Sequence, residues 1–226
     1  MNYQTCKDIF SNFFKLPKLT LSLNDRSLYV HFNKRHRLLI IPNKRIGVAL
    51  LQLPSVSGEY LVGSSRQALR TNCRKAERAG LSFAVIENPI DYLSDVMAIH
   101  NSMPVRQGRK MDTAYTNHEQ VSQYLTTHKP VYGVIDVQNR LHGYLDLLYA
   151  GEVAVINRLL GHRDALDLGV MYLLMAGVVE DAVTAKNKTG FPIYLMYDTY
   201  FGAAPGLRYF KDRTGFKPYK VSWRLV

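Results

Sequence analysis

Residues 130–161, PVYGVIDVQNRLHGYLDLLYAGEVAVINRLLG, contain three apolar runs rich in Val, Tyr and Leu. The runs cover residues 130–137, 140–150 and 152–161, and each has the length and the β-branched and aromatic content of a strand. Turn residues separate the runs, with Gln138-Asn139 after the first and Gly151 after the second. The stretch therefore predicts three consecutive antiparallel strands.

The residues after this stretch alternate between helical and strand patterns. We expect an apolar helix over 168–186, a buried strand over 192–198, a short helix over 204–215 and a last strand over 216–225. Antiparallel strands that lead into a helical crossover indicate an α+β protein. Its sheet is expected to be mixed, mainly antiparallel and flanked by helices.

The residues before the stretch are mainly helical in pattern. Helices are predicted over 64–80, 89–103 and 118–127, with a strand over 81–87 after the first. Residues 104–116 are polar, basic and irregular, so we expect a loop there.

The N-terminal part has its own pattern. Apolar residues at helical spacing predict a short amphipathic helix over residues 2–15. Residues 19–53 read as a strand meander, with runs at 19–23, 27–32, 37–42 and 45–53. We therefore expect a helix and strand meander over residues 1–60, packed on a main domain over residues 61–226.

The composition is that of an ordinary globular chain with a large positive charge. Of 226 residues, 29 are Lys or Arg and 18 are Asp or Glu, which gives a net charge of +11. Such an excess favours a polyanionic partner: nucleic acid, a phosphorylated cofactor, an acidic carrier protein or an anionic membrane face. Two cysteines, Cys6 and Cys73, exclude a disulfide scaffold and a Cys-rich metal site.

Several other classes of protein are excluded by what the sequence lacks. No apolar run is long enough to cross a bilayer and no signal-peptide pattern is visible, so a cytoplasmic protein is expected. The seven His residues lack ligand spacing, and there is no nucleophile elbow, phosphate-binding loop or dinucleotide fingerprint. We expect no metal site and no tightly bound cofactor.

Three stretches resemble segments of the GNAT acyltransferases, in particular their peptidoglycan-bridge branch, the FemAB-like aminoacyltransferases. They are SRQALRTNCRKAERAGLSFAV (65–85), LDLGVMYLLMAGVVEDAVTAKNKTGFPIYLMYD (166–198) and GLRYFKDRTGFKPYKVSW (206–223). The last, with its Gly-Leu-x-x-Phe-Lys-x-x-x-Gly-Phe signature, is the most specific. The bridge enzymes hold two such domains and a coiled-coil arm, whereas this chain has room for one domain. The resemblance implies acyl transfer to an amine, from a thioester or from an aminoacyl ester.

The resemblance places the phosphates of an acyl donor at the loop before the apolar helix, because a helix N-terminus attracts anions. The residues expected to hold a coenzyme A pyrophosphate there are Leu160, Gly161, His162, Arg163, Gly169 and Val170. Asp164 and Asp167 would repel the phosphates, and the usual glycine-rich phosphate loop is imperfect. Aminoacyl-tRNA users of this superfamily dispense with that loop.

A row of arginines runs along the first predicted helix. Arg66, Arg70, Arg74 and Arg78 recur at i+4, with a cost of about 0.2–0.5 kcal/mol for each like-charged pair. One interpretation is a docking surface for the phosphates of RNA or for an acidic carrier protein. The other is a solvated face whose arginine stems cover the edge of the core.

The candidate proton acceptor lies at the end of the predicted strand over 192–198. Asp198 stands where the FemAB-like pattern also has Asp, and Tyr197 and Tyr200 flank it. A carboxylate there can accept the ammonium proton, and Tyr200 can protonate the leaving group. Alternatively, Asp198 is a structural turn residue, and Asp146, with His142 on the same face, is the catalytic candidate.

The polar loop at residues 105–115 is the candidate acceptor site. Long polar connections carry function more often than packing. Its donors are expected to bind an anionic acceptor: Arg106, Gln107, Arg109 and Lys110.

The leading hypothesis is a GNAT-type N-acyltransferase that moves an acyl group from acyl-CoA, or from the phosphopantetheine of an acyl carrier protein, to an amine by direct attack. One alternative uses aminoacyl-tRNA as donor. Another, of a different class, is a catalytically degenerate GNAT fold that only binds nucleic acid or an acidic protein. The sequence leaves the oligomeric state open.

Overall fold

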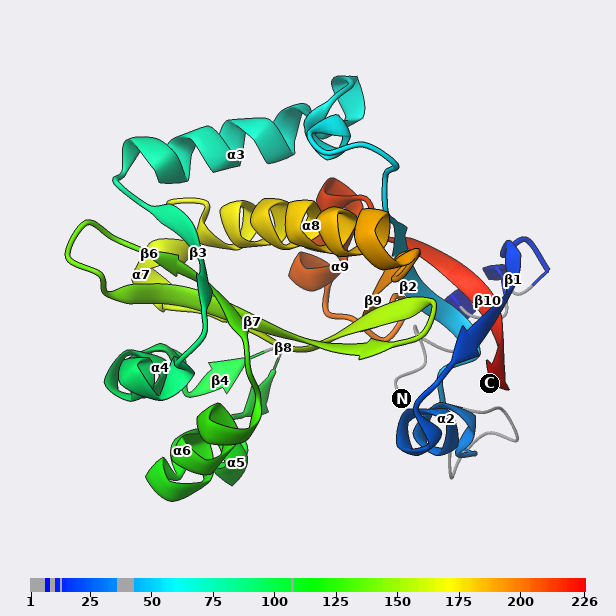
Figure 1. Cartoon of the computed structure of the whole chain (residues 1–226), viewed down its shortest axis with the longest axis horizontal. Helices are drawn as coiled ribbons and strands as arrows, with labels where there is room; N and C mark the ends of the chain where they lie inside the picture. The colour runs from blue at the N-terminus through cyan, green and yellow to red at the C-terminus, as the bar shows by residue number, and fades with distance from the viewer. Residues whose placement is uncertain (1–6, 9–10, 13, 36–42, 107) are drawn as a thin grey trace. The chain divides into compact units, whose positions relative to one another are not determined.

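The structure of the chain is a computed structural model that describes residues 7–8, 11–12, 14–35, 43–106 and 108–226 (Figure 1). The chain forms two compact units. The first unit comprises Met1–Ser57, Leu148–Ile156 and Ala182–Val226, and the second comprises Gly58–Leu147 and Asn157–Asp181.

Eight of the described strands form one sheet in the order β1-β10-β2-β9-β8-β7-β6-β3. Their bounds are β1 Lys18–Leu23, β2 Ile46–Gln52, β3 Ser82–Ile86, β6 Val131–Ile135, β7 Leu141–Ala150, β8 Val153–Gly161, β9 Tyr194–Thr199 and β10 Lys217–Leu225. β1 runs parallel to β10 and β8 parallel to β9, while β10 with β2, β2 with β9, β6 with β7 and β3 with β6 are antiparallel. The predicted α+β class with a mainly antiparallel sheet is confirmed.

The helices predicted over 64–80 and 89–103 are confirmed with shorter bounds, and the helix predicted over 118–127 is confirmed as predicted. The residue ranges are η1 Glu59–Leu61, η2 Ser64–Arg66, α3 Gln67–Arg78, η3 Pro89–Tyr92, α4 Leu93–Asn101, α5 Thr113–Thr116, α6 His118–Thr127 and α7 Arg163–Leu166. The loop expected at 104–116 holds α5 and a small hairpin of β4 (Val105–Arg106) and β5 (Arg109–Lys110). The apolar helix begins one residue after Gly169, as α8 (Val170–Thr189).

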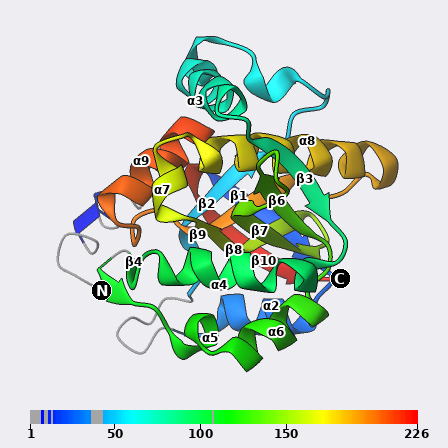
Figure 2. The same cartoon turned by 90° about the vertical axis from the view of Figure 1, so that its left-hand side faces the viewer.

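The core of the second unit lies between the sheet and the helices α4 and α6. Ile99 of α4, Leu125 of α6, Tyr144 of β7 and Leu160 of β8 pack there with less than a tenth of their surface exposed. Figure 2 shows α4, α5 and α6 gathered on one side of β6 and β7, with α8 on the other. Strand residues alternate between the two faces, so Gly143, next to Tyr144, faces Val170 of α8 instead.

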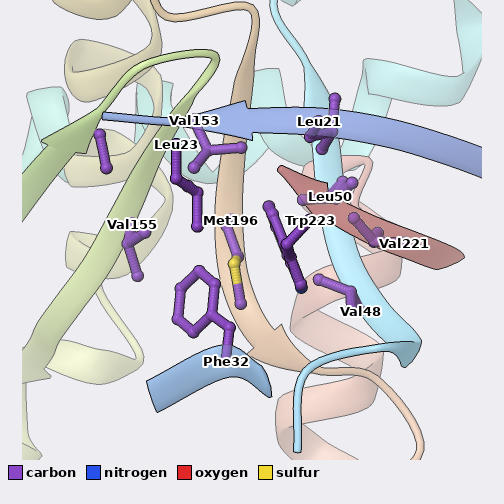
Figure 3. Close-up of a cluster of buried hydrophobic side chains, with 11 residues drawn as sticks. Leu21, Leu23, Phe32, Val48, Leu50, Val153, Val155, Met196, Val221 and Trp223 are labelled. Carbon is purple, nitrogen blue, oxygen red and sulfur yellow. The ribbon is translucent and has the colours of Figure 1, made fainter. Parts of the chain in front are cut away.

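The core of the first unit lies on one face of β1, β10, β2 and β9 (Figure 3). Phe32 and Trp223 meet with ring centroids 4.9 Å apart, and Leu23, Leu50 and Met196 surround them. The Trp223 indole N–H donates to the Lys44 carbonyl, which satisfies its one polar group. The helix α9 (Pro205–Thr214) follows β9 in this unit and ends at Gly215, which has a φ of 89°.

The strand predicted over 27–32 is wrong, because Arg26–Asn33 is the helix α2. Asp25 accepts the Leu28 N–H at 2.8 Å and begins the helix as its N-cap. A strand would bury Val30 beside Leu28 and Phe32, whereas Val30 is 59% exposed. Apolar and polar residues alternate in this short run as they would in a strand. The same apolar residues also fit a helix whose buried face holds Leu28, Tyr29 and Phe32.

The meander is also wrong in its pairing. β1 pairs in parallel with β10, the last strand, and not with the strand that follows it along the chain. The strand predicted over 45–53 is confirmed as β2, whereas the run at 37–42 and most of the helix predicted over 2–15 lie outside the described residues. No helix among the described residues is both long and apolar enough to cross a membrane.

Candidate functional site

Three of the predicted catalytic residues lie together at the end of β9 in the first unit. Asp198 has a φ of 51°, in the left-handed region, and its side chain is 60% exposed and ion-paired with Lys44. The Tyr200 hydroxyl donates to the Asp212 carboxylate, and burial together with this bond raises the pKa of Tyr200 to about 12. Tyr197 packs edge-on against Phe216, and burial raises its pKa. Asp198 thus offers a carboxylate and Tyr200 a proton.

Lys211 of α9 organises the backbone around Asp198. The described ladder between β8 and β9 pairs Val153–Val155 with Tyr194–Met196, and β9 continues to Thr199. The Lys211 ammonium donates to the carbonyl oxygens of Tyr197 at 2.7 Å and Thr199 at 2.8 Å. Lys211 is only 1% exposed, and burial lowers its pKa to about 8. It therefore holds the residues on both sides of Asp198.

The fourth predicted catalytic residue, Asp146, lies in the second unit and is 1% exposed. One of its oxygens accepts the Asn157 amide at 2.9 Å and the other the Arg158 backbone N–H at 2.9 Å. Both oxygens of Asp146 are therefore engaged by the neighbouring strand β8. His142 does not join it, because its Nε2 lies 2.9 Å from Asp136 instead.

Arg158 enters an aromatic and polar cluster beside Asp146. Its guanidinium carbon lies 3.4 Å from the ring centroid of Tyr124 and 4.4 Å from that of Tyr115. His100, fully buried, bonds through Nδ1 to the Tyr115 carbonyl at 2.6 Å and through Nε2 to the Tyr144 hydroxyl at 2.7 Å. A carbonyl only accepts, so Nδ1 carries the proton and Nε2 accepts the Tyr144 O–H.

Burial lowers the pKa of His100 to about 4, with the nearby Arg158 and Arg106 adding to the effect. The imidazole is therefore neutral at pH 7. Burial also raises the pKa values of Tyr124 and Tyr144.

The loop predicted to hold a coenzyme A pyrophosphate has most of its N–H groups engaged. The N–H of His162 donates to the His142 carbonyl at 2.8 Å, that of Arg163 to the Ser102 hydroxyl at 3.0 Å and that of Asp164 to the His162 ring at 3.3 Å. Ala165, Leu168 and Gly169 donate to carbonyls of the same loop. Leu160 and Val170 are buried in the core, with 7% and 0% of their surface exposed.

Gly169 closes the loop against α3. It has a φ of 89°, and a Cβ there would lie 2.4 Å from the carbonyl oxygen of Asn72. Gly161 is also close-packed, since a Cβ there would lie 2.6 Å from the sulfur of the Met171 side chain. These contacts give both glycines a packing role.

The row of arginines divides into two pairs. Arg66 lies 5.0 Å from the ring centroid of Tyr60, and Arg70 donates to the carbonyls of Leu61 at 2.6 Å and Gly63 at 2.7 Å. Arg74 and Arg78 are exposed. The first pair therefore binds the preceding turns, and the second pair faces solvent.

The predicted acceptor loop also divides. Arg106 donates to the carbonyls of Ile99 at 2.7 Å and Gly161 at 3.2 Å, both in its own unit. Lys110 is exposed. Gln107 lies outside the described residues, and Arg109 is described only by its backbone, in β5 opposite Arg106.

The sequence analysis missed Lys211, Arg158, Tyr124 and His100 as site residues. Lys211 carried a signal, because it is the lysine of the closing signature and the spacing of α9 places it on the face that Thr214 buries. Arg158 carried one too, since a charged residue interrupts an apolar strand two positions before Leu160. Among the described residues no three His, Cys, Asp or Glu side chains gather as a metal site would require.

The strand order, the crossover helix α8 and the closing helix and strand form a GNAT-like fold. No family model matches the chain, and no curated protein matches its sequence.

Solved structures do match. The chain is similar to FemX, with a TM-score of 0.54 and 9% identity over 76% of this chain and 59% of that one. It is similar to the C-terminal domain of a putative lysylphosphatidylglycerol synthetase from Agrobacterium fabrum, with a TM-score of 0.52 and 16% identity over 77% and 58%. L-PGS from Bacillus licheniformis matches with a TM-score of 0.52 and 15% identity over 77% and 58%. The likeness is one of fold, and it spans under three fifths of each of those chains.

Proposed function

We propose that the protein is an N-acyltransferase that transfers an aminoacyl group from aminoacyl-tRNA to an amine. The amine nitrogen attacks the ester carbonyl, a C–N bond forms, and the bond from carbonyl carbon to ribose oxygen breaks. The acceptor loses a proton and the ribose oxygen gains one, so an amide and a free tRNA hydroxyl result. The GNAT-like fold supports acyl transfer, and no covalent enzyme intermediate is needed.

One observation favours an aminoacyl ester over a coenzyme A thioester. Six N–H groups between His162 and Gly169 donate to protein acceptors, so few are left to bind a pyrophosphate. The exposed carboxylates of Asp164 and Asp167 add repulsion at the same loop. One of the similar structures is the C-terminal domain of a putative lysylphosphatidylglycerol synthetase, and a lysylated product is consistent with an aminoacyl donor.

Proton transfer is assigned to the end of β9. Asp198 is the exposed carboxylate that accepts the proton of the acceptor ammonium, directly or through water. Tyr200 stays protonated at neutral pH and supplies a proton to the leaving ribose oxygen. Lys211 is the positioning residue, because it fixes the carbonyls on both sides of Asp198.

The exposed end of α3 is assigned to the tRNA phosphates. Arg74 and Arg78 lie one turn apart, and Lys75 beside them is also exposed. Three cations close together on one helix form a local phosphate-binding surface, whereas the intervening Glu77 offsets only one of them.

Acyl-CoA, or an acyl carrier protein, is the second candidate donor. The observation that favours it is the exposed Arg163 at the start of α7, directly after the strand β8. A cytoplasmic location is part of either proposal.

The test uses the purified full chain with three donors in parallel: aminoacyl-tRNA, uncharged tRNA and acetyl-CoA. We expect the chain to retain charged tRNA on filters more strongly than uncharged tRNA and to transfer a radiolabelled amino acid to an amine. Thermal stabilisation by millimolar acetyl-CoA together with acetyl transfer would establish the second candidate instead. Equal, weak binding to both tRNA forms, erased by moderate salt and without transfer from either donor, would leave only a binding function.

A further inference from the structure

The strand β3 is the last strand at one end of the described sheet, and it pairs only with β6 (Figure 2). The pairing is regular along all five residues, from Ser82 opposite Ile135 to Ile86 opposite Val131. The hydrogen-bonding groups of a strand alternate between its two edges, so part of the β3 backbone points away from β6. In the described part of the chain no hydrogen bond reaches this outer edge.

The strand at the other end of the sheet shows how this chain protects an edge. β1 begins with the charged Lys18. The Ser22 N–H donates to the Glu152 carboxylate, and the Ser22 carbonyl accepts the Glu152 backbone N–H at 3.1 Å. β3 has no such protection, since its sequence SFAVI holds no charge and no proline, and its register holds no bulge. A strand of ordinary length with such an edge is a template for pairing with another strand.

The side chains along β3 are mostly apolar, and one of them is only half covered. Phe83 packs against α8, where its ring fills the space that a Cβ at Gly177 would need, and it stacks on Tyr132 with ring centroids 6.1 Å apart. Val85 points to the same face two residues further on, yet it is 43% exposed. A further strand beside β3 would cover Val85.

The sequence of β3 is complementary to itself about Ala84. When two copies meet antiparallel with this residue on the two-fold axis, Val85 of each copy lies opposite Phe83 of the other. Pairs of β-branched and aromatic side chains stabilise a sheet. The same register sets the exposed Glu87 of one copy opposite Leu81 of the other, three residues after the exposed Arg78. Symmetry therefore brings opposite charges together at both ends of the paired strands.

We propose that β3 is a self-association edge, which pairs antiparallel with β3 of a second copy of this chain and continues the sheet across a two-fold axis. Backbone hydrogen bonds supply the attraction, and the pairs of Val85 with Phe83 fix the register. The contact is short and each copy carries a net charge of +11, so the dimer is weak and forms as the concentration rises. The inference does not depend on the proposed acyl transfer, and its test needs no substrate.

The first experiment measures the mass of the full chain by analytical ultracentrifugation over a range of protein and salt concentrations. We expect the mass to rise with protein concentration from that of one chain to that of two. Salt should favour the dimer, because it screens the repulsion between two positively charged copies. Binding of RNA weakens with salt, so contaminating RNA would give the opposite dependence.

The second experiment changes the exposed side chain of the edge. Val85→Lys places a charge on β3 and should weaken the dimer about tenfold or more, because symmetry removes the pair with Phe83 twice. Val62→Lys adds the same charge at a position of the same unit that is 69% exposed and lies outside β3, and it should leave the dimer unchanged. Thermal unfolding checks that both variants fold.

The third experiment tests the register by disulfide trapping under mild oxidation. Ala84→Cys should give a linked dimer, because the two substituted residues face each other across the axis. Ser82→Cys is the matched control, since Ser82 lies opposite Ile86 of the second copy and too far from its own counterpart for a disulfide. The wild type, with Cys6 and Cys73, sets the background. If Val85→Lys does not fold, the trapping carries the comparison.

A chain that stays monomeric at every concentration would reject the second copy and leave the edge to a strand of another protein. A dimer that Val85→Lys leaves intact, or that Ser82→Cys links as readily as Ala84→Cys, would place the interface elsewhere and reject the assignment of β3. Acyl transfer by a strictly monomeric chain would overturn this inference alone, whereas a β3 dimer without transfer from any donor would overturn only the proposed function.

Discussion

The Lys211 ammonium donates to the carbonyl oxygen of Tyr197 at 2.7 Å, from the helix α9 to the strand β9. The same nitrogen donates to Thr199, so one buried side chain satisfies two backbone acceptors. The residue between them is Asp198, the proposed proton acceptor. The lysine of the closing signature therefore links the last helix of the fold to the candidate site.

Replacing Lys211 with Met should lower the free energy of unfolding by about 1–3 kcal/mol, because two carbonyl groups lose their donor while the apolar stem is kept. Lys217→Met, at an exposed position of β10, is the matched control and should change stability by less than about 0.5 kcal/mol. Denaturant unfolding measures both. Equal stability of Lys211→Met and the wild type would show that these bonds contribute nothing net.

Gly169→Ala should lower the free energy of unfolding by about 3 kcal/mol or more, because a Cβ at this positive φ would collide with the Asn72 carbonyl. Gly206→Ala is the matched substitution in α9, where a Cβ would meet no atom within 4 Å. It should stabilise the protein by about 0.5–1 kcal/mol, since alanine favours the helix. Thermal unfolding measures the change in stability of each variant. If both variants were destabilised, or both stabilised, the result would contradict the contact of Gly169 with α3.

The stability of the protein should fall as the pH drops from about 6.5 to about 4, in part because of His100. Its pKa is lowered from 6.5 to about 4 in the folded chain, so the unfolded chain binds more protons in this window. By linkage, this costs up to about 3 kcal/mol. His100→Gln, which keeps an acceptor for Tyr144, should flatten the difference between pH 7 and pH 4.5, while His118→Gln at an exposed site should not. If stability fell equally with pH in the wild type and both variants, the His100 ring could not be buried and neutral.

Asp198→Asn should lower kcat for transfer about a hundredfold or more while the protein stays folded, because asparagine tolerates the left-handed φ but cannot accept the proton. Tyr200→Phe should lower kcat less, since water can protonate the leaving oxygen. Single-turnover kinetics with charged tRNA separates these effects from binding. Full turnover in both variants would remove the end of β9 from the mechanism.

Arg74→Gln with Arg78→Gln should weaken binding of tRNA and make it less dependent on salt. Each phosphate contact that is lost should reduce the slope of log K against log salt by about 0.7–0.9. Arg66 and Arg70 are unsuitable for this test, because they bind Tyr60 and the turn carbonyls. Arg140→Gln is the control, and an unchanged slope in the double variant would move the RNA-binding surface away from α3.

The elements that the sequence predicted correctly are those whose signal is local. The strands within 130–161 have apolar runs separated by turn residues, and β6, β7 and β8 follow them closely. The strand prediction within residues 26–33 was wrong because a short apolar run fits both the alternation of a strand and the spacing of a helix. The Asp25 side chain, bonded to the N–H three residues on, decides for the helix.

The bonding partners of the candidate site residues could not be predicted, because they are distant along the chain. Asp198 and Tyr200 followed from their place at a strand end, but nothing local showed that Lys44 and Asp212 bind them. Arg70 belonged to a regular row, yet it binds the turn at Leu61 and Gly63.

The order and periodicity of the amino acids were enough to predict the α+β class and the succession of strands and helices after residue 130. The composition alone gave the net charge of +11. Only the tertiary structure decided that β1 joins β10, that Lys211 supports Asp198 and that Arg158 lies against the rings of Tyr115 and Tyr124. The reason is physical: local periodicity sets which face of an element is apolar, whereas register and packing between remote elements set which polar groups meet and which stay without a partner.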